Sequence, residues 1–367
     1  MKIAYLTIAN CLFVRERSRQ LVKSGHEVHY IGVVPFNPAL LNLKFTLPEG
    51  ITYHAVDATH RNRLFRTLAK LTQLMRVVRE ISPDVLHVID MGYTIYLPFL
   101  KRKKVVIEHN GTDILVKPQK SRVWRMFYRF VYRYAHAVIQ DSVVAQEAGW
   151  ACGASRRNNE VIELGIDFSL FNLTIPRGTA RRRLALEPKD RMVFSPRGFK
   201  ALYNIETILR SIPLVKESFP QVRYVFCSPV LQEGDEYPML IDTLGVGGEV
   251  IFAGLLDKQH ELPSFYADAE AVLSVPSSDS SPSTVYEAMA CGAPVVVSEL
   301  PWYRGRFEAE RDFLVVSPGD AQALAAAVIR VLSGAVRFDH GAISERVRRY
   351  SDIEVNGGRL AELYERL

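Results

Sequence analysis

The sequence predicts an α/β protein with two doubly wound domains of the Rossmann-like type, which face each other across a central cleft. Two observations lead to this fold class. In both halves of the chain, apolar runs of strand length alternate with helical segments, the pattern of parallel sheets covered by helices. Polar loops follow these runs directly, and ligands of such folds bind at the carboxyl ends of the strands.

Three parts are predicted along the chain. Residues 1–170 form the first domain, residues 171–188 a linker, and residues 189–351 the second domain. The linker lies where Pro176, Gly178 and a run of arginines interrupt the periodicity of helices and strands.

The first domain begins with the strand-like run MKIAYLTI, followed by a helix that Gly25 ends and by the alternating strand HEVHYIGV. Arg15, Arg17 and Arg19 stand in the segment after the first strand. They form either a solvated helix face or a site for an anionic molecule beside the cleft. Farther along, RLFRTLAKLTQLMRVVREI predicts an amphipathic helix that Pro83 stops.

A polar loop, EHNGTD, follows a buried strand at residues 108–113. A step of one residue along a strand reverses the direction of a side chain. Either His109 or Asn110 therefore faces the cleft, with Glu108 and Asp113 beside it. The alternative is that His109 is a structural residue at the end of the strand.

Residues 117–135, KPQKSRVWRMFYRFVYRYA, interleave basic with aromatic side chains. A basic, aromatic amphipathic helix can lie on an anionic bilayer. The alternative is a domain helix with its apolar face in the core and its arginines in water. The aromatic residues are many for one core stripe, so both interpretations stay open.

The second domain opens with a strand, a loop, a helix and a strand between residues 191 and 227. Arg197 and Lys200 lie in the loop after the first of these strands, and Asn204 is expected to cap the helix. Gly254 marks the end of a later strand.

The segment AVLSVPSSDSSPSTVYEAMACGAPVVVS, residues 271–298, is typical of a compact βαβ unit. Ser283 or Thr284 is expected to cap its short helix. The helix N-terminus, with unpaired N–H groups and a partial positive charge, suits the phosphates of a nucleotide. Asp279 and Glu287 can hold neighbouring hydroxyls of a ribose or hexose. From spacing alone, the alternative is a solvated loop residue and an ordinary helical one.

Composition excludes several classes of protein. Of the 367 residues, 48% are hydrophobic and 23% charged, the balance of a soluble globular protein. No apolar run approaches about 18 residues, so no transmembrane helix is expected. The four cysteines lack metal-ligand spacing and are expected to be free thiols in a reducing cytoplasm. The sequence has no Asp-x-Asp motif for a metal.

The charge is uneven along the chain. Residues 1–180 carry 25 Lys/Arg and 14 Asp/Glu, a net charge of +11, whereas residues 181–367 have a net charge of −5. The first half is therefore expected to meet something anionic, such as a membrane surface or a phosphorylated acceptor. We expect no nucleic-acid partner, because the sequence has none of the common motifs.

Several segments resemble those of the family 4 glycosyltransferases, retaining enzymes with the GT-B fold. SPSTVYEAMACGAPVVVS is similar to their donor-binding signature, and SGHEVHYIG, EHNGTD and ELGIDFSLF resemble other family segments. The resemblance spans nearly the whole chain, strongest in residues 190–335 and weakest in residues 1–60. It implies an N-terminal acceptor-side domain, a C-terminal nucleotide-sugar donor domain and a final helix, at about residues 352–367, that packs back on the first domain.

The resemblance also implies roles for single residues in the donor site. Glu287 would bind the donor ribose, and Asp279, one methylene shorter than the family's glutamate, would face the transferred sugar. Arg197 would neutralise the diphosphate, and Lys200 would replace a family lysine whose position falls near Leu202. The remaining donor contacts would be Ser283, Thr284 and Val285 at the diphosphate and backbone near Gly254 at the base.

In the first domain, the resemblance places His109 or Asn110 near the reacting sugar. Arg15, Arg17 and Asp113 are expected on the acceptor side. A catalytic base from the protein is not obligatory, because retaining transferases of this class are commonly argued to use the donor phosphate to deprotonate the acceptor.

We therefore expect a metal-independent retaining glycosyltransferase without a cofactor. It would move a sugar from a nucleotide-diphosphate sugar, such as a UDP- or GDP-sugar, to a carbohydrate or lipid-linked acceptor. The product would be a cell-envelope polysaccharide, glycolipid or glycoconjugate, made in the cytoplasm with peripheral attachment to the inner face of the cell membrane. The alternatives are an epimerase-like GT-B enzyme and a catalytically inactive GT-B scaffold.

Overall fold

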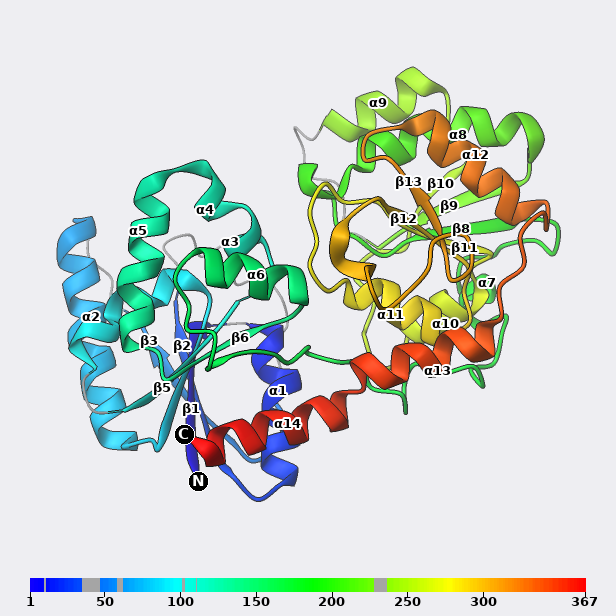
Figure 1. Cartoon of the computed structure of the whole chain (residues 1–367). Helices are drawn as coiled ribbons and strands as arrows, with labels where there is room; N and C mark the ends of the chain where they lie inside the picture. Colours follow the sequence, from blue (N-terminus) through cyan, green and yellow to red (C-terminus); the bar gives the residue numbers. More distant parts are fainter. Residues whose placement is uncertain (10, 35–46, 58–61, 101–102, 110, 228–235) are drawn as a thin grey trace. The chain divides into compact units, whose positions relative to one another are not determined.

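The computed structural model describes residues 1–9, 11–34, 47–57, 62–100, 103–109, 111–227 and 236–367. The chain divides into two units, one made of Met1–Leu164 with Ile353–Leu367 and the other of Gly165–Asp352. Each unit contains one parallel sheet with helices on its faces (Figure 1). The α/β fold class with two doubly wound domains is confirmed.

The first unit has a seven-stranded sheet in the order β3-β2-β1-β4-β5-β6-β7, and every pairing in it is parallel. Its strands are β1 (Lys2–Ile8), β2 (Glu27–Val33), β3 (Ile51–Val56), β4 (Val85–Ile89), β5 (Lys104–Glu108), β6 (Ala137–Gln140) and β7 (Asn159–Val161). The central strands are buried on both faces, as expected for a parallel sheet covered by helices.

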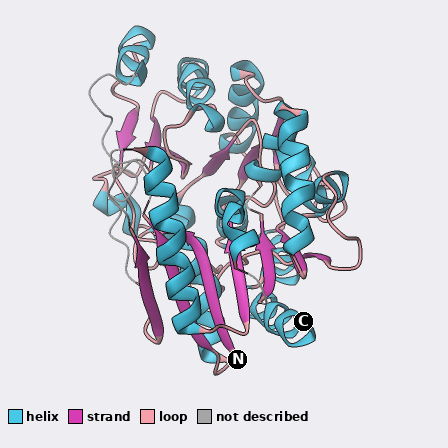
Figure 2. Cartoon of the chain, turned by 90° about the vertical axis from the view of Figure 1, so that its left-hand side faces the viewer, coloured by secondary structure: helices cyan, strands magenta, loops and turns pink. Residues whose placement is uncertain are grey.

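The helices of the first unit are α1 (Leu12–Lys23), α2 (Arg63–Ile81), α3 (Thr112–Leu115), α4 (Lys117–Lys120), α5 (Arg122–Val131), α6 (Val143–Ala151) and α14 (Ile353–Arg366), with 3-10 turns η2 (Met91–Phe99) and η3 (Tyr132–Tyr134). Figure 2, viewed from the left-hand side of Figure 1, shows helices lying over the strands. Helix α2 matches the predicted amphipathic helix, because Asn62 caps its start and Ser82, with φ of 49°, ends it before Pro83.

The second unit has a six-stranded parallel sheet in the order β10-β9-β8-β11-β12-β13. Its strands are β8 (Arg191–Ser195), β9 (Val222–Phe226), β10 (Val250–Phe252), β11 (Ala271–Ser274), β12 (Val295–Ser298) and β13 (Leu314–Val316). Its helices are α7 (Thr179–Arg183), α8 (Ile205–Ser218), α9 (Glu236–Leu244), α10 (Leu262–Asp268), α11 (Ser283–Ala290), α12 (Ala321–Leu332) and α13 (His340–Ser351), with 3-10 turns η4 (Ala201–Tyr203) and η5 (Pro301–Tyr303).

Residues 171–188 are not a separate linker. They belong to the second unit, where the Phe171 side chain is fully buried and Ala180 joins the same core cluster. The Asp268 carboxylate accepts hydrogen bonds from the backbone N–H groups of Gly178 and Arg181. The proline and glycine that suggested a linker instead mark turns of a segment that packs onto α10.

Apolar clusters lie on the two faces of each sheet. In β1, Ala4 and Leu6 join one cluster, whereas Ile3 and Tyr5 join the other, because successive side chains of a strand point to opposite faces. In β8, Phe194 packs with α10 and α11, and Val193 packs with α8 and α12. These packed faces hold the strands in place and fix where their carboxyl-end loops emerge.

Candidate functional site

The order of strands in the second sheet reverses between β8 and β11. Ligands of doubly wound sheets bind outside the carboxyl ends of the strands at such a switch point. The loop after β8 carries Arg197 and the loop after β11 carries Asp279. The topology therefore brings together two residues that are far apart in the sequence.

Arg197 is held by three neighbours. Its Nη2 lies 2.5 Å from Asp279 Oδ2, its Nε donates to Ser274 Oγ at 3.3 Å, and its Cζ lies 5.1 Å from the centroid of the Tyr203 ring. Its side chain is only 15% exposed. Asp279 is oriented from the other side, because its Oδ1 accepts a hydrogen bond from the Ser280 N–H at 2.9 Å.

Helix α11 begins beside this ion pair, but not as the sequence suggested. Pro282 is its N-cap residue, and no side chain caps the helix, so the expected cap by Ser283 or Thr284 is wrong. The N–H of Val285 donates to the Pro282 carbonyl, and the Val285 side chain is buried in the core. Among the described residues, the N–H groups of Ser283 and Thr284 have no hydrogen-bond partner. These two N–H groups, rather than that of Val285, can meet an anion.

Glu287 lies one turn into α11 and is almost completely buried. Tyr266 donates its hydroxyl to Oε2 at 3.0 Å, and Lys258 Nζ lies 3.2 Å from Oε1. Burial raises the pKa of Tyr266, and the Glu287 carboxylate raises it further, so this phenol remains protonated. Lys258, in the loop after β10, was not predicted from the sequence. No spacing rule connects it to Glu287, and only the parallel sheet places the two together.

Lys200 and Gly254 also lie at the carboxyl ends of strands in this unit. Lys200 precedes η4, and its ammonium is exposed, without a hydrogen bond or ion pair to any described residue. Gly254 follows the end of β10 by two residues and adopts φ of +75°, which glycine tolerates without strain. Asn204 does not cap α8 through its side chain. Its amide donates instead to the Val275 carbonyl at 2.9 Å.

Models of two glycosyltransferase families match this chain. The model described as "Glycosyl transferases group 1" matches residues 176–348, and the model described as "Glycosyl transferase 4-like" matches residues 2–142. The chain is a glycosyltransferase. Arg197, Asp279 and Glu287 of this glycosyltransferase all lie within the first of these matches.

A curated relative matches part of the chain. A sulfoquinovosyl transferase from Arabidopsis thaliana is 25% identical over an alignment of 249 residues, which covers 63% of this chain and 46% of that protein. This chain thus spans about half the length of that curated relative.

Solved structures share the GT-B fold. Sucrose-phosphate synthase from Thermosynechococcus elongatus has a TM-score of 0.82 at 19% identity, over 100% of this chain and 98% of that one. Anabaena HepE in complex with UDP and glucose has a TM-score of 0.78 at 17% identity, over 100% of both chains.

In the first unit of the glycosyltransferase, His109 is fully buried and both ring nitrogens are engaged. Nδ1 is hydrogen-bonded to Asp113 Oδ2 and Nε2 to the Tyr132 hydroxyl, each at 2.9 Å. The ring also stacks on Tyr128 with 5.8 Å between centroids. His109 therefore has the structural role that the sequence left as an alternative, and the predicted contact with the reacting sugar is wrong for it. Asn110 lies outside the described residues.

Asp113 is likewise turned inward. Its side chain is 6% exposed and accepts from His109, while its backbone carbonyl accepts from the Tyr128 hydroxyl. The expected acceptor contact by Asp113 is therefore corrected to a structural contact that joins α3 to α5. The EHNGTD motif follows a buried strand, as predicted, but the direction of each side chain depends on packing against α5 and η3.

Arg17 is also a structural residue rather than an acceptor contact. Its guanidinium donates to Glu108 Oε1 at 2.8 and 3.2 Å and to the carbonyls of Ile162 and Glu163 at 2.6 and 2.7 Å. The side chains of Arg17 and Glu108 are 1% and 2% exposed. Arg15 remains half-buried on the same helix.

The Arg17–Glu108 pair continues into a buried network. His87 Nε2 lies 3.1 Å from Glu108 Oε2, and its Nδ1 lies 2.5 Å from the hydroxyl of Tyr364 on α14. Burial lowers the pKa of His87, which keeps the imidazole neutral. Burial alone would raise the pKa of Glu108, but Arg17 and His87 outweigh burial and lower it to about 2.

Helix α5 buries only some of its apolar side chains. Tyr128 and Val131 are fully buried in the core. Four other apolar side chains are in water: Val123 is 75% exposed, Met126 70%, Phe130 45% and Trp124 41%. Arg122, Arg125, Arg129 and Arg133 are exposed beside them. We call Val123, Trp124, Met126 and Phe130, with these four arginines, the α5 surface.

All four cysteines are free thiols. Within the described residues, no group of three or more His, Cys, Asp or Glu side chains could hold a metal ion. The part of the chain that the structure describes also has no helix of the length and apolar character that would span a bilayer.

Proposed function

We propose that this glycosyltransferase binds a nucleotide-diphosphate sugar at the carboxyl ends of β8 and β11 and transfers the sugar with retention of configuration. The observation that supports this most strongly is the Arg197–Asp279 pair beside the start of α11. It puts a cation, a carboxylate and two unpaired N–H groups at the switch point of one sheet.

The leaving diphosphate would be stabilised by Arg197 and by the N–H groups of Ser283 and Thr284. An arginine fork matches phosphate oxygens, and a helix N-terminus adds a partial positive charge. Such preorganised groups stabilise charge that develops in the transition state. We therefore propose that these groups neutralise the diphosphate without a metal ion.

Glu287 would bind the donor ribose, as the family resemblance implies. Its carboxylate contacts Tyr266 and Lys258 and its side chain is only 3% exposed, so one of these partners must move to give ribose hydroxyls access to it. Lys258 is the partner that can leave, because its side chain is 34% exposed whereas Tyr266 is fully buried. We propose that Lys258 then turns to the diphosphate. It would supply the positive charge of the family lysine whose position falls near Leu202 in this chain.

Asp279 would hold hydroxyls of the transferred sugar while Arg197 fixes its carboxylate. The donor phosphate itself would take the proton of the acceptor. The internal hydrogen bonds of His109 favour this proposal, since both ring nitrogens of the histidine expected near the sugar already have partners.

Calorimetric titration with UDP, GDP, uridine and guanosine tests the donor site. Binding of one diphosphate is expected, and Arg197→Ala should weaken it about tenfold or more, because a charge-assisted bond is lost. Binding of the matching nucleoside should weaken much less. Arg210→Ala, an exposed arginine paired with Glu206 on α8, is the matched control. Failure to bind any nucleotide would favour an inactive scaffold, and equal losses for diphosphate and nucleoside would place Arg197 away from the phosphates.

We further propose that the α5 surface docks on the anionic inner face of the cell membrane and that the acceptor is a lipid-linked or envelope saccharide. Exposed apolar side chains can enter the headgroup region while neighbouring arginines meet anionic lipids, each contributing roughly 1 kcal/mol. The net charge of +11 in residues 1–180 adds a longer-range attraction.

Co-sedimentation with phosphatidylcholine vesicles, with and without phosphatidylglycerol, tests this docking. Binding only to the anionic vesicles is expected. It should fall when Lys120, Arg125 and Arg129 are changed to Gln, while donor hydrolysis stays intact. Changing the exposed Arg182, Arg311 and Arg349 of the second unit to Gln is the control for charge alone. Equal binding to both vesicle types, or none at low salt, would contradict the proposal.

A further inference from the structure

A pocket lies at the amino ends of strands in the second sheet, whereas the donor-site residues follow the carboxyl ends. Its cavity has a volume of about 400 Å³. Arg191 begins β8, Glu270 directly precedes β11 and Pro294 directly precedes β12, so the pocket borders the amino ends of three parallel strands. Arg197 and Asp279 follow the carboxyl ends of the same sheet, so one small ligand cannot reach both places.

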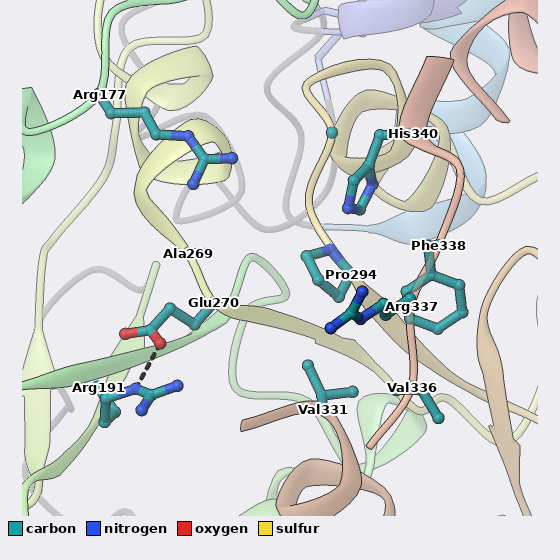
Figure 3. Close-up of a pocket in the computed structure, with 11 residues that line it drawn as sticks. Arg177, Arg191, Ala269, Glu270, Pro294, Val331, Val336, Arg337, Phe338 and His340 are labelled. Carbon is teal, nitrogen blue, oxygen red and sulfur yellow. Dashed lines mark hydrogen bonds and ion pairs between the residues drawn. The ribbon is translucent and has the colours of Figure 1, made fainter. Parts of the chain in front are cut away.

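The pocket is rich in positive charge. Arg177, Arg191 and Arg337 line it together with a single carboxylate, Glu270. That carboxylate is occupied: Arg191 Nε donates to its Oε2, and Arg181 Nη1 lies 3.9 Å from its Oε1. Figure 3 shows the Arg191–Glu270 pair at one side of the pocket.

The other two arginines have no counter-ion. Among the described residues, the guanidinium groups of Arg177 and Arg337 make no hydrogen bond or ion pair. In Figure 3 both guanidinium groups point toward the open centre of the pocket. Unneutralised arginines that converge on a cavity attract an anion, and their planar forks match the oxygens of a phosphate.

The rest of the lining is apolar or aromatic. Val331, Val336, Pro294 and the Phe338 ring form one wall, and the His340 ring lies 6.3 Å from that of Phe338. Burial lowers the pKa of His340, and Arg177 lowers it further, so the imidazole is neutral at pH 7. The wall thus offers two uncharged rings and aliphatic side chains to the part of a ligand that carries no charge.

We propose that this pocket binds a phosphate monoester with an uncharged ring, the phosphate on Arg177 and Arg337 and the ring against Phe338 and His340. The volume is in the range of small-molecule sites, roughly 300–1,000 Å³. This site is separate from the proposed donor site and does not depend on it. It gives the second unit a place for a phosphorylated metabolite that does not compete with the nucleotide sugar.

Calorimetry with glucose 6-phosphate, AMP, inorganic phosphate and glucose tests the site on the full chain. One of the two esters is expected to bind at least tenfold more tightly than inorganic phosphate, and glucose is expected not to bind. The ester that binds distinguishes a sugar phosphate from a nucleotide. No binding of either ester, or equal binding of ester and inorganic phosphate, would overturn the proposal.

Variants then locate the bound ester. Arg337→Ala should weaken its binding about tenfold or more, because a charge-assisted contact is lost. Arg349→Ala removes the same charge from an exposed position outside the pocket, and Arg197→Ala removes the donor-site cation. Both should leave ester binding within twofold of the unchanged protein. A loss in Arg197→Ala, or competition by UDP or GDP, would place the ester in the donor site instead.

Discussion

Arg197 and Asp279 hold each other across the switch point of the second sheet, with 2.5 Å between Nη2 and Oδ2. The pair joins two loops that follow different strands, and Ser274 and Ser280 orient its two ends. The residue expected to meet the diphosphate and the residue expected to meet the sugar are therefore expected to depend on each other.

The Arg197–Asp279 pair predicts that the losses of activity in the two single variants are not additive. Arg197→Ala and Asp279→Ala should each lower kcat/KM for the nucleotide sugar by about 10²-fold, because each leaves the other charge unpaired. The double variant should lose at least tenfold less than the product of the two single losses. Steady-state kinetics of the four proteins give the coupling. Fully additive losses would show that the two residues act independently.

Glu287 and Lys258 give a second prediction. Glu287→Ala should cut turnover by about 10²-fold or more, because a hydroxyl-binding carboxylate is lost. Lys258→Met should raise KM several-fold and Lys258→Arg should restore it, because only the latter keeps a cation that can turn to the diphosphate. If Lys258→Met has unchanged kinetics, Lys258 is only a surface partner of Glu287.

The fold and the polar loops after β8 and β11 could be predicted from the sequence because both depend on local patterns. Apolar runs alternate with helices, and polar residues follow strands. The direction of single side chains could not be predicted in this way. His109 and Arg17 carry the right chemistry for a site, yet packing against α5 and the buried Glu108 turns them inward. Lys258 was missed for the same reason, since its contact with Glu287 exists only after the sheet has formed.

The Arg17–Glu108 pair predicts a large effect on stability without a direct effect on chemistry. Arg17→Met should lower the free energy of unfolding by about 3–5 kcal/mol, because it leaves the Glu108 carboxylate buried and uncompensated. Chemical denaturation measures this loss. The double variant Arg17→Met with Glu108→Leu should recover most of it, whereas a single variant as stable as the unchanged protein would contradict the buried pair.

Buried His87 predicts a loss of stability in mild acid. Its pKa is lowered in the folded state, so below pH 6.5 the unfolded chain binds a proton that the folded chain does not. Stability is therefore highest above pH 6.5 and falls on acidification, by at most about 1.4 kcal/mol per pH unit for this group. Glu108, with a pKa of about 2 against 4.5, adds a further loss as the pH falls below 4.5.

Denaturation at pH 7.5, 6.5 and 5.5 measures this dependence. His87→Gln should reduce the difference in unfolding free energy between pH 7.5 and pH 5.5, whatever its effect on stability at neutral pH. His260→Gln, at an exposed histidine, should leave that difference unchanged. A pH dependence that is identical in the unchanged protein and His87→Gln would show that His87 does not stay neutral in the fold.

The central proposal is sugar transfer from a nucleotide-diphosphate donor with retention, and NMR of donor cleavage tests it most directly. The purified protein is incubated with a panel of UDP- and GDP-sugars, and the first-formed anomer of the released or transferred sugar is observed. We predict release of nucleoside diphosphate from one member of the panel and a product with the donor's anomeric configuration, both lost in Glu287→Ala. An inverted product, or neither cleavage nor nucleotide binding across the panel, would contradict it.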